Sequence, residues 1–193
     1  MNNAQRILLV AAIAALALVP ASSALAKKPP PPPDDAAALV AGVYTEVMGS
    51  GSEESESALP APPASAEVDS LGASAETADA FLAACYWAQV RRYGKNLFGM
   101  TLWSYYQRIE WCANSSYITS RTRIRWGETS FPGWSFKGHT GSTTGGGVGY
   151  TYFRARTQGH FCLIQYFSCV QNAYPWIDMT VRRNGTYTYS TGG

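Results

Sequence analysis

The clearest alternation of side-chain types along the chain lies between residues 117 and 126. One set of alternate positions holds Ile118, Ser120, Thr122, Ile124 and Trp126, and the other holds Tyr117, Thr119, Arg121, Arg123 and Arg125. A period of two places the two sets on opposite faces of a β-strand. Similar alternations over 150–156 and 177–182 predict two further strands.

Turn signals separate these strands and predict how they connect. Asn184-Gly185, between 177–182 and 186–190, is the strongest short signal for a β-hairpin. Further turns are expected at 94–96 and 114–116. Short strands at this spacing predict an all-β fold over residues 80–193, an antiparallel β-sandwich or a small barrel.

The N-terminus has the pattern of an export signal. Arg6 precedes an apolar run from Ile7 to Val19, and small residues follow at 24–26. The run is shorter than the roughly 20 residues that a membrane-spanning helix needs. Residues 1–26 are therefore predicted to be a signal peptide cleaved near Ala26, leaving a protein that is secreted, extracellular or associated with the cell surface, without a transmembrane segment.

Residues 27–79 differ sharply in composition from the rest. Five consecutive prolines at 29–33 are followed by segments rich in Ala, Ser, Pro and Glu that contain few large apolar residues. Such a chain cannot bury enough surface to offset its ordering entropy, so 27–79 is predicted to be a disordered acidic tail or pro-segment. A helix over 36–48 is expected only against a partner.

Charge is divided between these two parts. Residues 29–79 contain ten acidic residues and no Lys or Arg, whereas residues 80–193 contain twelve basic and three acidic residues. The overall net charge of +2 conceals this division. We therefore expect the tail to contact its own basic domain, and the domain to bind an anionic polymer or surface.

All four cysteines lie in the basic domain: Cys85, Cys112, Cys162 and Cys169. An even number in an exported chain predicts two disulfides. Three pairings are open, and we favour Cys85–Cys112 with Cys162–Cys169 because these two pairs close short loops. No C-x-x-C pair is present, so we expect no metal site and no cofactor.

Residues suited to catalysis are few. The weak candidates are Glu110 and Glu128, as the carboxylate pair of a small glycan hydrolase, and His139 as a base. His139 lies in the glycine-rich stretch 136–150, which matches neither phosphate-binding glycine pattern and is predicted to be a mobile loop. The chain therefore favours a binding protein over an enzyme.

The stronger signal is a pair of one-sided rows rich in arginine. The predicted ligand-binding residues are Arg121, Arg123, Arg125, Tyr150, Tyr152, Arg154 and Arg156. Guanidinium groups match carboxylates and phosphates, and tyrosine rings stack on sugars. The first hypothesis is a secreted, non-catalytic binding module for an anionic envelope or extracellular polymer, such as an acidic glycan or wall polymer. The alternative is an antibacterial or inhibitor-type effector that its acidic tail keeps latent.

Several short motifs resemble uncharacterised secreted bacterial β-rich proteins. They are Trp111-Cys112, Ile118-Thr119-Ser120, Trp126-Gly127-Glu128-Thr129, Gly133-Trp134 with Lys137-Gly138-His139, and Trp176 to Val181. The resemblance covers roughly residues 85–190 and implies an exported β domain. It implies no activity.

Overall fold

A computed structural model describes residues 39–52, 61–72 and 83–193, all of which belong to one unit, Pro32–Gly193. The predicted signal peptide 1–26 lies outside these residues, so the leader and its cleavage stay predictions. The described residues form strands, turns and bends, and they include no helix that could cross a membrane.

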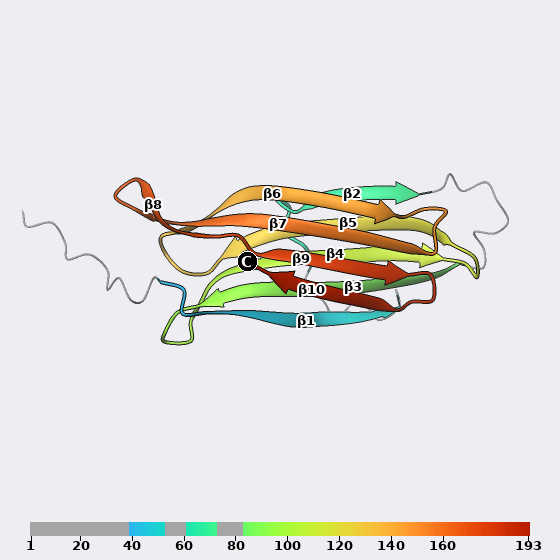
Figure 1. Ribbon diagram of the computed structural model, residues 1–193, viewed down its shortest axis with the longest axis horizontal. Coiled ribbons are helices and arrows are strands. Elements are labelled where there is room, and N and C mark those ends of the chain that lie inside the picture. The colour runs from blue at the N-terminus through green and yellow to red at the C-terminus, as the bar shows by residue number, and fades with distance from the viewer. Residues whose placement is uncertain (1–38, 53–60, 73–82) are drawn as a thin grey trace, which may run out of the picture. The chain divides into compact units, whose positions relative to one another are not determined.

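Ten strands make up the described fold (Figure 1). The first five are β1 (Gly42–Ser52), β2 (Glu67–Gly72), β3 (Ala84–Lys95), β4 (Thr101–Ala113) and β5 (Ile118–Thr129). The others are β6 (Trp134–Gly146), β7 (Tyr152–Gln165), β8 (Ser168–Ala173), β9 (Trp176–Arg182) and β10 (Tyr187–Gly192).

The strands form two antiparallel sheets that pack face to face. Sheet A has the order β1-β3-β4-β5-β2, and sheet B has the order β10-β9-β7-β6, with β8 paired to β7. The predicted antiparallel β-sandwich is therefore confirmed. The turns predicted at 94–96, 114–116 and 184–185 lie at or beside the ends of strands β3, β4 and β9.

The core lies between the sheets and follows the period-two pattern. Sheet A contributes alternate residues of β4, including Trp103, which stacks on Phe161 of sheet B with ring centroids 5.1 Å apart. Gln107 in the same row donates to the carbonyl of Ala155 across the core at 2.9 Å. The aromatic side chains provide most of the area that these two faces remove from water.

Both disulfides have the favoured pairing, Cys85–Cys112 and Cys162–Cys169. Cys85 lies directly opposite Cys112 on neighbouring strands, so the first bond joins β3 to β4. The second joins β7 to β8. Each disulfide therefore reinforces one sheet, and neither crosses the sandwich.

Two stretches of the acidic segment differ from the predicted disorder. Residues 42–52 form β1 on one edge of sheet A, and residues 67–72 form β2 on the other. The helix considered over 36–48 is also wrong from Gly42 onwards, because Val43 and its neighbours pair with β3 and Val43 packs on the core. Pairing with a preformed edge supplies the burial that the segment lacks alone. The rest of 27–79, apart from 39–41 and 61–66, lies outside the described residues.

The glycine-rich stretch is a strand rather than a loop over most of its length. Residues 134–146 form β6 and pair with β7, with two register shifts between Phe136 and Gly141. Glycine permits close packing here: a Cβ added to Gly159, opposite His139, would lie 2.7 Å from the Tyr105 ring. Gly159 belongs to β7, whereas a Cβ added to Gly138 or Gly145 of β6 would meet nothing within 4 Å. Local composition indicated a loop because it does not show that the stretch pairs with β7.

Candidate functional site

The first arginine row points into the space between the sheets. Arg121, Arg123 and Arg125 lie opposite Trp111, Ile109 and Gln107, which belong to the buried face of β4. Each arginine is only 5–7% exposed. The alternation therefore identified one face of the strand correctly, but that face is internal rather than solvated.

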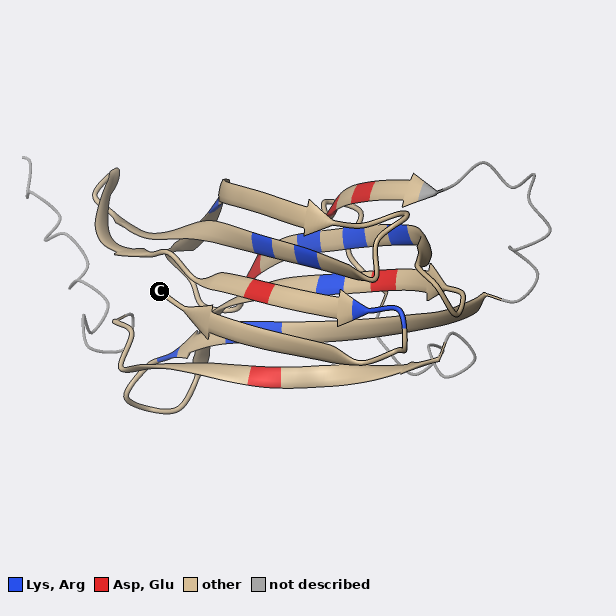
Figure 2. Cartoon of the chain, turned by 45° about the vertical axis from the view of Figure 1, so that its right-hand side comes forward, with Lys and Arg blue, Asp and Glu red and all other residues tan. Residues whose placement is uncertain are grey.

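Carboxylates from β2 neutralise this row (Figure 2). Asp69 approaches Arg121 at 3.2 Å and Arg123 at 3.3 Å, and Glu67 pairs with Arg125. The pairing register explains these contacts, because Glu67 lies opposite Arg125 and Asp69 opposite Arg123. An acidic stretch of the N-terminal segment thus occupies the guanidinium groups of the basic domain.

The same arginines also bridge the two sheets. Arg123 donates to Ser142 of β6 at 2.9 Å, Arg125 donates to Thr157 of β7 at 3.3 Å, and Arg121 lies 4.3 Å from the ring centroid of Phe153. Burial lowers the pKa of Arg123, with a further contribution from Arg125. Without β2, the row would leave buried positive charge uncompensated.

His139 belongs to a closed ring of five side chains beside this row. Its Nδ1 lies 2.8 Å from the Tyr105 hydroxyl, which lies 2.6 Å from the Thr157 hydroxyl. Thr157 accepts from Arg125, Arg125 pairs with Glu67, and Glu67 lies 3.6 Å from His139 Nε2. The ring joins β2 and β5 to β4, β6 and β7.

No group in this ring is tuned for proton transfer near neutral pH. Burial, followed by the charge of Arg125, lowers the pKa of His139 to about 4. Burial raises the pKa of Tyr105 to about 12. The hydrogen bond from Arg125 lowers the pKa of Glu67. At neutral pH His139 is neutral, so its contact with Glu67 is no ion pair and the ring is a structural network.

The two candidate catalytic carboxylates are far apart. Glu110 lies opposite Thr122, and Glu128 lies opposite Ser104, so six residue positions separate them along the strand pair. At about 3.4 Å per residue this is about 20 Å, twice the separation that a glycosidase pair uses. Glu110 pairs with Arg108 at 2.8 Å, and Glu128 accepts from the side chains of Tyr106 and Trp126.

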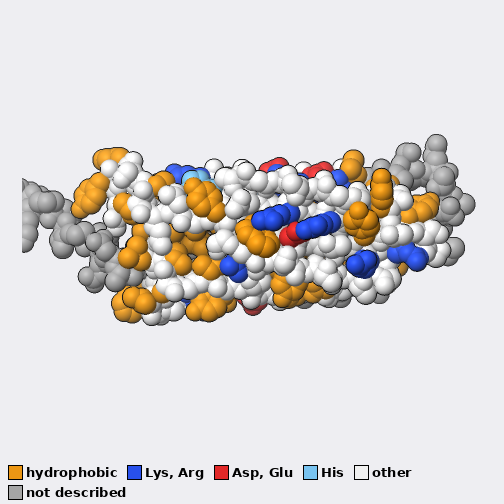
Figure 3. Space-filling view, in the orientation of Figure 1, with side chains coloured by type: hydrophobic (Ala, Val, Ile, Leu, Met, Phe, Trp, Pro, Cys, Tyr) orange, Lys and Arg blue, Asp and Glu red, His pale blue; other side chains and the backbone are white. Residues whose placement is uncertain are grey.

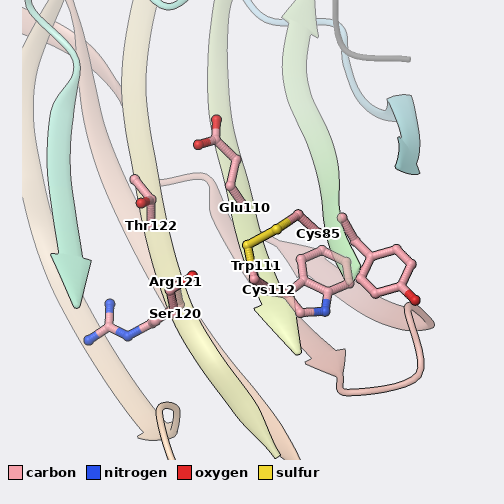
Figure 4. A pocket seen from close by; sticks show the side chains of 8 residues that line it. Cys85, Glu110, Trp111, Cys112, Ser120, Arg121 and Thr122 are labelled. Atoms are coloured by element: carbon pink, nitrogen blue, oxygen red, sulfur yellow. A yellow bond between two sulfur atoms is a disulfide. The ribbon is translucent and has the colours of Figure 1, made fainter. Parts of the chain in front are cut away.

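A shallow hollow lies beside the Cys85–Cys112 disulfide (Figure 4). Its lining residues are Cys85, Tyr86, Glu110, Trp111, Cys112, Ser120, Arg121 and Thr122. The Glu110 carboxylate extends along one side, whereas the Arg121 side chain points away (Figure 4). In the described part of the chain no three His, Cys, Asp or Glu residues are grouped to hold a metal ion.

Tyr152, Arg154 and Arg156 of the second predicted row lie on the outer face of sheet B (Figure 3), and Tyr150 lies in the turn before β7. Arg154 forms a two-pronged pair with Asp178, with Nε–Oδ1 and Nη2–Oδ2 distances of 3.0 and 2.5 Å. Arg156 lies over the ring of Trp176, 4.1 Å from its centroid. Tyr150 and Tyr152 are exposed, with their rings edge to face at 6.4 Å.

The first row therefore belongs to sheet A and faces the inside of the sandwich, whereas Arg154 and Arg156 lie on the outer face of sheet B, so the two rows do not share one surface. A strand's period of two assigns side chains to two faces but does not say which face another sheet covers. Sequence reasoning also missed Trp176 and the stacked pair of His160 and Tyr174, which share the outer face of sheet B. Extending the alternation over 177–182 back by one residue would place Trp176 on the face of Asp178, and this was the available signal.

Comparison with protein-family models, with curated proteins and with solved structures found no match, so the chain's function is argued from its own residues.

Proposed function

We propose that this protein is a secreted, non-catalytic module that binds an acidic glycan through the outer face of sheet B. The observation that supports this most directly is the stacked pair of Arg156 and Trp176. It presents a guanidinium group stacked over an aromatic ring on an open sheet face. Stacking on the ring fixes the guanidinium plane, which reduces the ordering cost of binding a carboxylate.

The surroundings of this pair suit an extended sugar chain. β6 contributes Gly145 opposite Arg154 and Thr143 opposite Arg156, so part of the neighbouring surface carries no side chain. A flat face of this kind allows the sugar rings to approach the sheet, while exposed aromatic residues such as Tyr152 can pack on their apolar sides.

Charge favours an acidic ligand over a neutral one. On this face Tyr152 lies opposite Arg182, and Arg156 lies opposite Asp178. The row thus contains three arginines, at 154, 156 and 182, and one aspartate, which Arg154 already pairs. The remaining positive charge can bind uronate carboxylates. The two disulfides support an oxidising, extracellular setting.

Isothermal titration with polygalacturonate, with a neutral glucan as the reference ligand, tests the proposal. We expect binding to polygalacturonate that weakens about tenfold in Arg156→Ala and in Trp176→Ala, because each change removes one half of the stacked pair. Lys137→Ala removes an exposed positive charge of β6 that lies outside this row and should leave the affinity within about twofold.

Two outcomes would refute this assignment. One is the absence of binding to polygalacturonate, and the other is binding that Trp176→Ala leaves unchanged. Binding to duplex DNA without binding to polygalacturonate would also reject a glycan ligand, since it would show recognition of phosphate alone.

The contacts of β2 favour a second candidate function, an effector that its own acidic segment keeps latent. Glu67 and Asp69 occupy the guanidinium groups of Arg121, Arg123 and Arg125. If β2 left the sheet edge, these arginines would become a row of anion-binding groups about 7 Å apart.

Killing of target bacteria by the native chain and by a Glu67→Gln/Asp69→Asn variant tests this second function. Latency predicts activity in the variant and little or none in the native chain, because the neutral side chains hold β2 less tightly. Glu46→Gln, which affects an exposed ion pair of β1, is the matched control. Equal inactivity of all three proteins, with the variant still folded, would reject latency.

A further inference from the structure

Exposed apolar side chains are concentrated at one end of the sandwich. Three turns meet there: residues 96–100 between β3 and β4, residues 130–133 between β5 and β6, and the β7–β8 turn at 166–167. The strand registers bring these turns together, because Trp103 pairs with Thr129 in sheet A and Trp134 pairs with Leu163 in sheet B. Figures 1 and 3 show this end on the left.

The exposure is largest at the tips of two turns. Phe167 and Tyr166 at the β7–β8 tip are 104% and 82% exposed, and Leu97 and Phe98 at the β3–β4 tip are 73% and 69% exposed. Large apolar residues that are exposed in adjacent pairs at one end of the molecule, rather than scattered singly, indicate an interaction surface. We call these four residues the apolar tips.

The two residues at the β7–β8 tip are unusual for the backbone conformation that they adopt. Tyr166 and Phe167 have positive φ values of 47° and 70°, as a two-residue hairpin turn requires. Asn-Gly would fit this turn without strain, whereas a bulky aromatic residue in the left-handed region is disfavoured. These residues pack little on the rest of the chain, so folding does not explain the aromatic pair.

The stem beneath this tip is held firmly. The Cys162–Cys169 disulfide joins its two strands, and Gln165 pairs with Ser168 directly below the turn. Gln171 of β8 also accepts a hydrogen bond from the backbone of Val40 at 3.2 Å. The aromatic pair is therefore presented on a rigid hairpin, which lowers the entropy cost of burying the two rings against a binding partner.

The charge around the apolar tips is positive. The described segments at this end, residues 39–41, 95–104, 128–138 and 161–175, contain Lys95, Lys137 and one acidic residue, Glu128, whose carboxylate accepts from the side chains of Tyr106 and Trp126. A partner that covers this end should therefore be apolar in its interior and negatively charged at its surface. A bilayer that contains anionic lipid has both properties.

We propose that the apolar tips insert into the interface of an anionic lipid bilayer and dock the protein on a membrane surface. Tyr favours this interfacial region, where its ring is buried while its hydroxyl stays hydrated, and Phe is buried at the boundary with the acyl chains. Two separate convex tips suit a fluid layer that adapts around them. A second copy would present the same tips and the same lysines, so self-association would oppose like charges.

Vesicle flotation with protein exported by an expressing host tests this proposal. One vesicle type is pure phosphatidylcholine, and the other is an equal mixture with phosphatidylglycerol. The informative variant is Tyr166→Asn/Phe167→Gly, which removes both rings and installs the pair that the turn prefers. We expect it to melt no lower than the native chain and to bind mixed vesicles at least tenfold more weakly.

Controls separate this surface from the rest of the molecule. Tyr189→Ser removes a 44% exposed tyrosine on β10, and Trp176→Ala affects the glycan face. Both variants should float with mixed vesicles as the native chain does. Leu97→Ser/Phe98→Ser tests the second tip and should also weaken flotation at least tenfold.

Four results would overturn the proposal. They are failure of the native chain to float with mixed vesicles, equal flotation with pure phosphatidylcholine, undiminished flotation of the Asn-Gly variant, and a native dimer that this variant converts to a monomer. The last result would identify a second copy as the partner. Loss of glycan binding in Trp176→Ala with intact flotation would show that the two surfaces act separately.

Discussion

At the scale of single residues, His139 shows how a buried polar ring makes stability depend on pH. Its pKa of about 4 in the fold lies well below the ordinary value of about 6.5. As pH falls below 6.5, the unfolded chain binds a proton that the folded chain does not. Stability therefore decreases from about pH 6.5 towards pH 4, by roughly 2 kcal/mol between pH 7.5 and pH 5.

Urea unfolding at these two pH values measures the effect, and His139→Gln is the control. Glutamine keeps a hydrogen-bonding group near Tyr105 but does not titrate, so the variant should lose roughly 2 kcal/mol less than the native chain over this interval. Glu67 contributes separately, because its lowered pKa gives a stabilisation that is present above its ordinary value of 4.5 and is lost only as pH falls below that value. Identical pH dependence of both proteins would contradict the assignment to His139.

The arginine residues show what could be predicted from local pattern and what could not. The positions of Arg121, Arg123 and Arg125 on one strand face followed from the period of two. Their burial could not be predicted from this pattern. It depends on Glu67 and Asp69, which lie more than fifty residues earlier in the chain and occupy the sheet edge beside the arginines. The row at 152–156 lies on the outer face of sheet B, and among the described residues Asp178 is the acidic residue that pairs with it.

At the scale of elements, β2 is held to sheet A by charge as well as by its ladder. Glu67→Gln/Asp69→Asn should lower the free energy of unfolding by about 1–3 kcal/mol for each charge removed, because buried arginines lose their partners. Glu46→Gln removes the 3.5 Å pair with Arg91, whose two side chains are 49% and 22% exposed, and should cost at most about 1 kcal/mol. Urea unfolding compares the three proteins, and equal losses would contradict the distinction.

The glycines of β6 and β7 differ in the space around them, and substitution by alanine distinguishes the two cases. In Gly159→Ala the new methyl group would meet the Tyr105 ring, so we expect a loss of about 1–3 kcal/mol from overpacking. Gly145→Ala meets nothing within 4 Å and should be neutral or slightly stabilising. Thermal unfolding of both variants measures the difference, and comparable melting temperatures would contradict the role assigned to Gly159.

The glycine-rich strand also shows why composition misled at this scale. Six glycines between 136 and 150 resemble a linker when they are considered alone. In the fold, a Cβ added to Gly138 or Gly145 would meet nothing within 4 Å, so packing between the sheets does not require these glycines. The segment is a strand because it pairs with β7 from Trp134 to Gly146, and a single stretch of sequence does not contain that partner.

At the scale of the whole molecule, the disulfides and the packing of side chains stabilise different parts of the fold. Cys85–Cys112 lies within sheet A and Cys162–Cys169 within sheet B, so the contact between sheets depends on the aromatic core and the arginine bridges. Trp103→Ala should therefore cost about 3–5 kcal/mol in the oxidised protein, since it empties the centre of that contact. Urea unfolding under oxidising conditions checks this value, and a loss below about 1 kcal/mol would contradict it.

The two disulfides should differ in their effect on global stability because they close loops of different length. The first spans 27 residues and the second spans 7. Restriction of the unfolded chain predicts losses of about 3.5 kcal/mol for Cys85→Ala/Cys112→Ala and about 2.5 kcal/mol for Cys162→Ala/Cys169→Ala. Urea unfolding of the two double variants measures the order. A larger loss from the second pair would show that the β7–β8 stem contributes packing to the fold, and it would weaken the view that this hairpin serves mainly to present its tip.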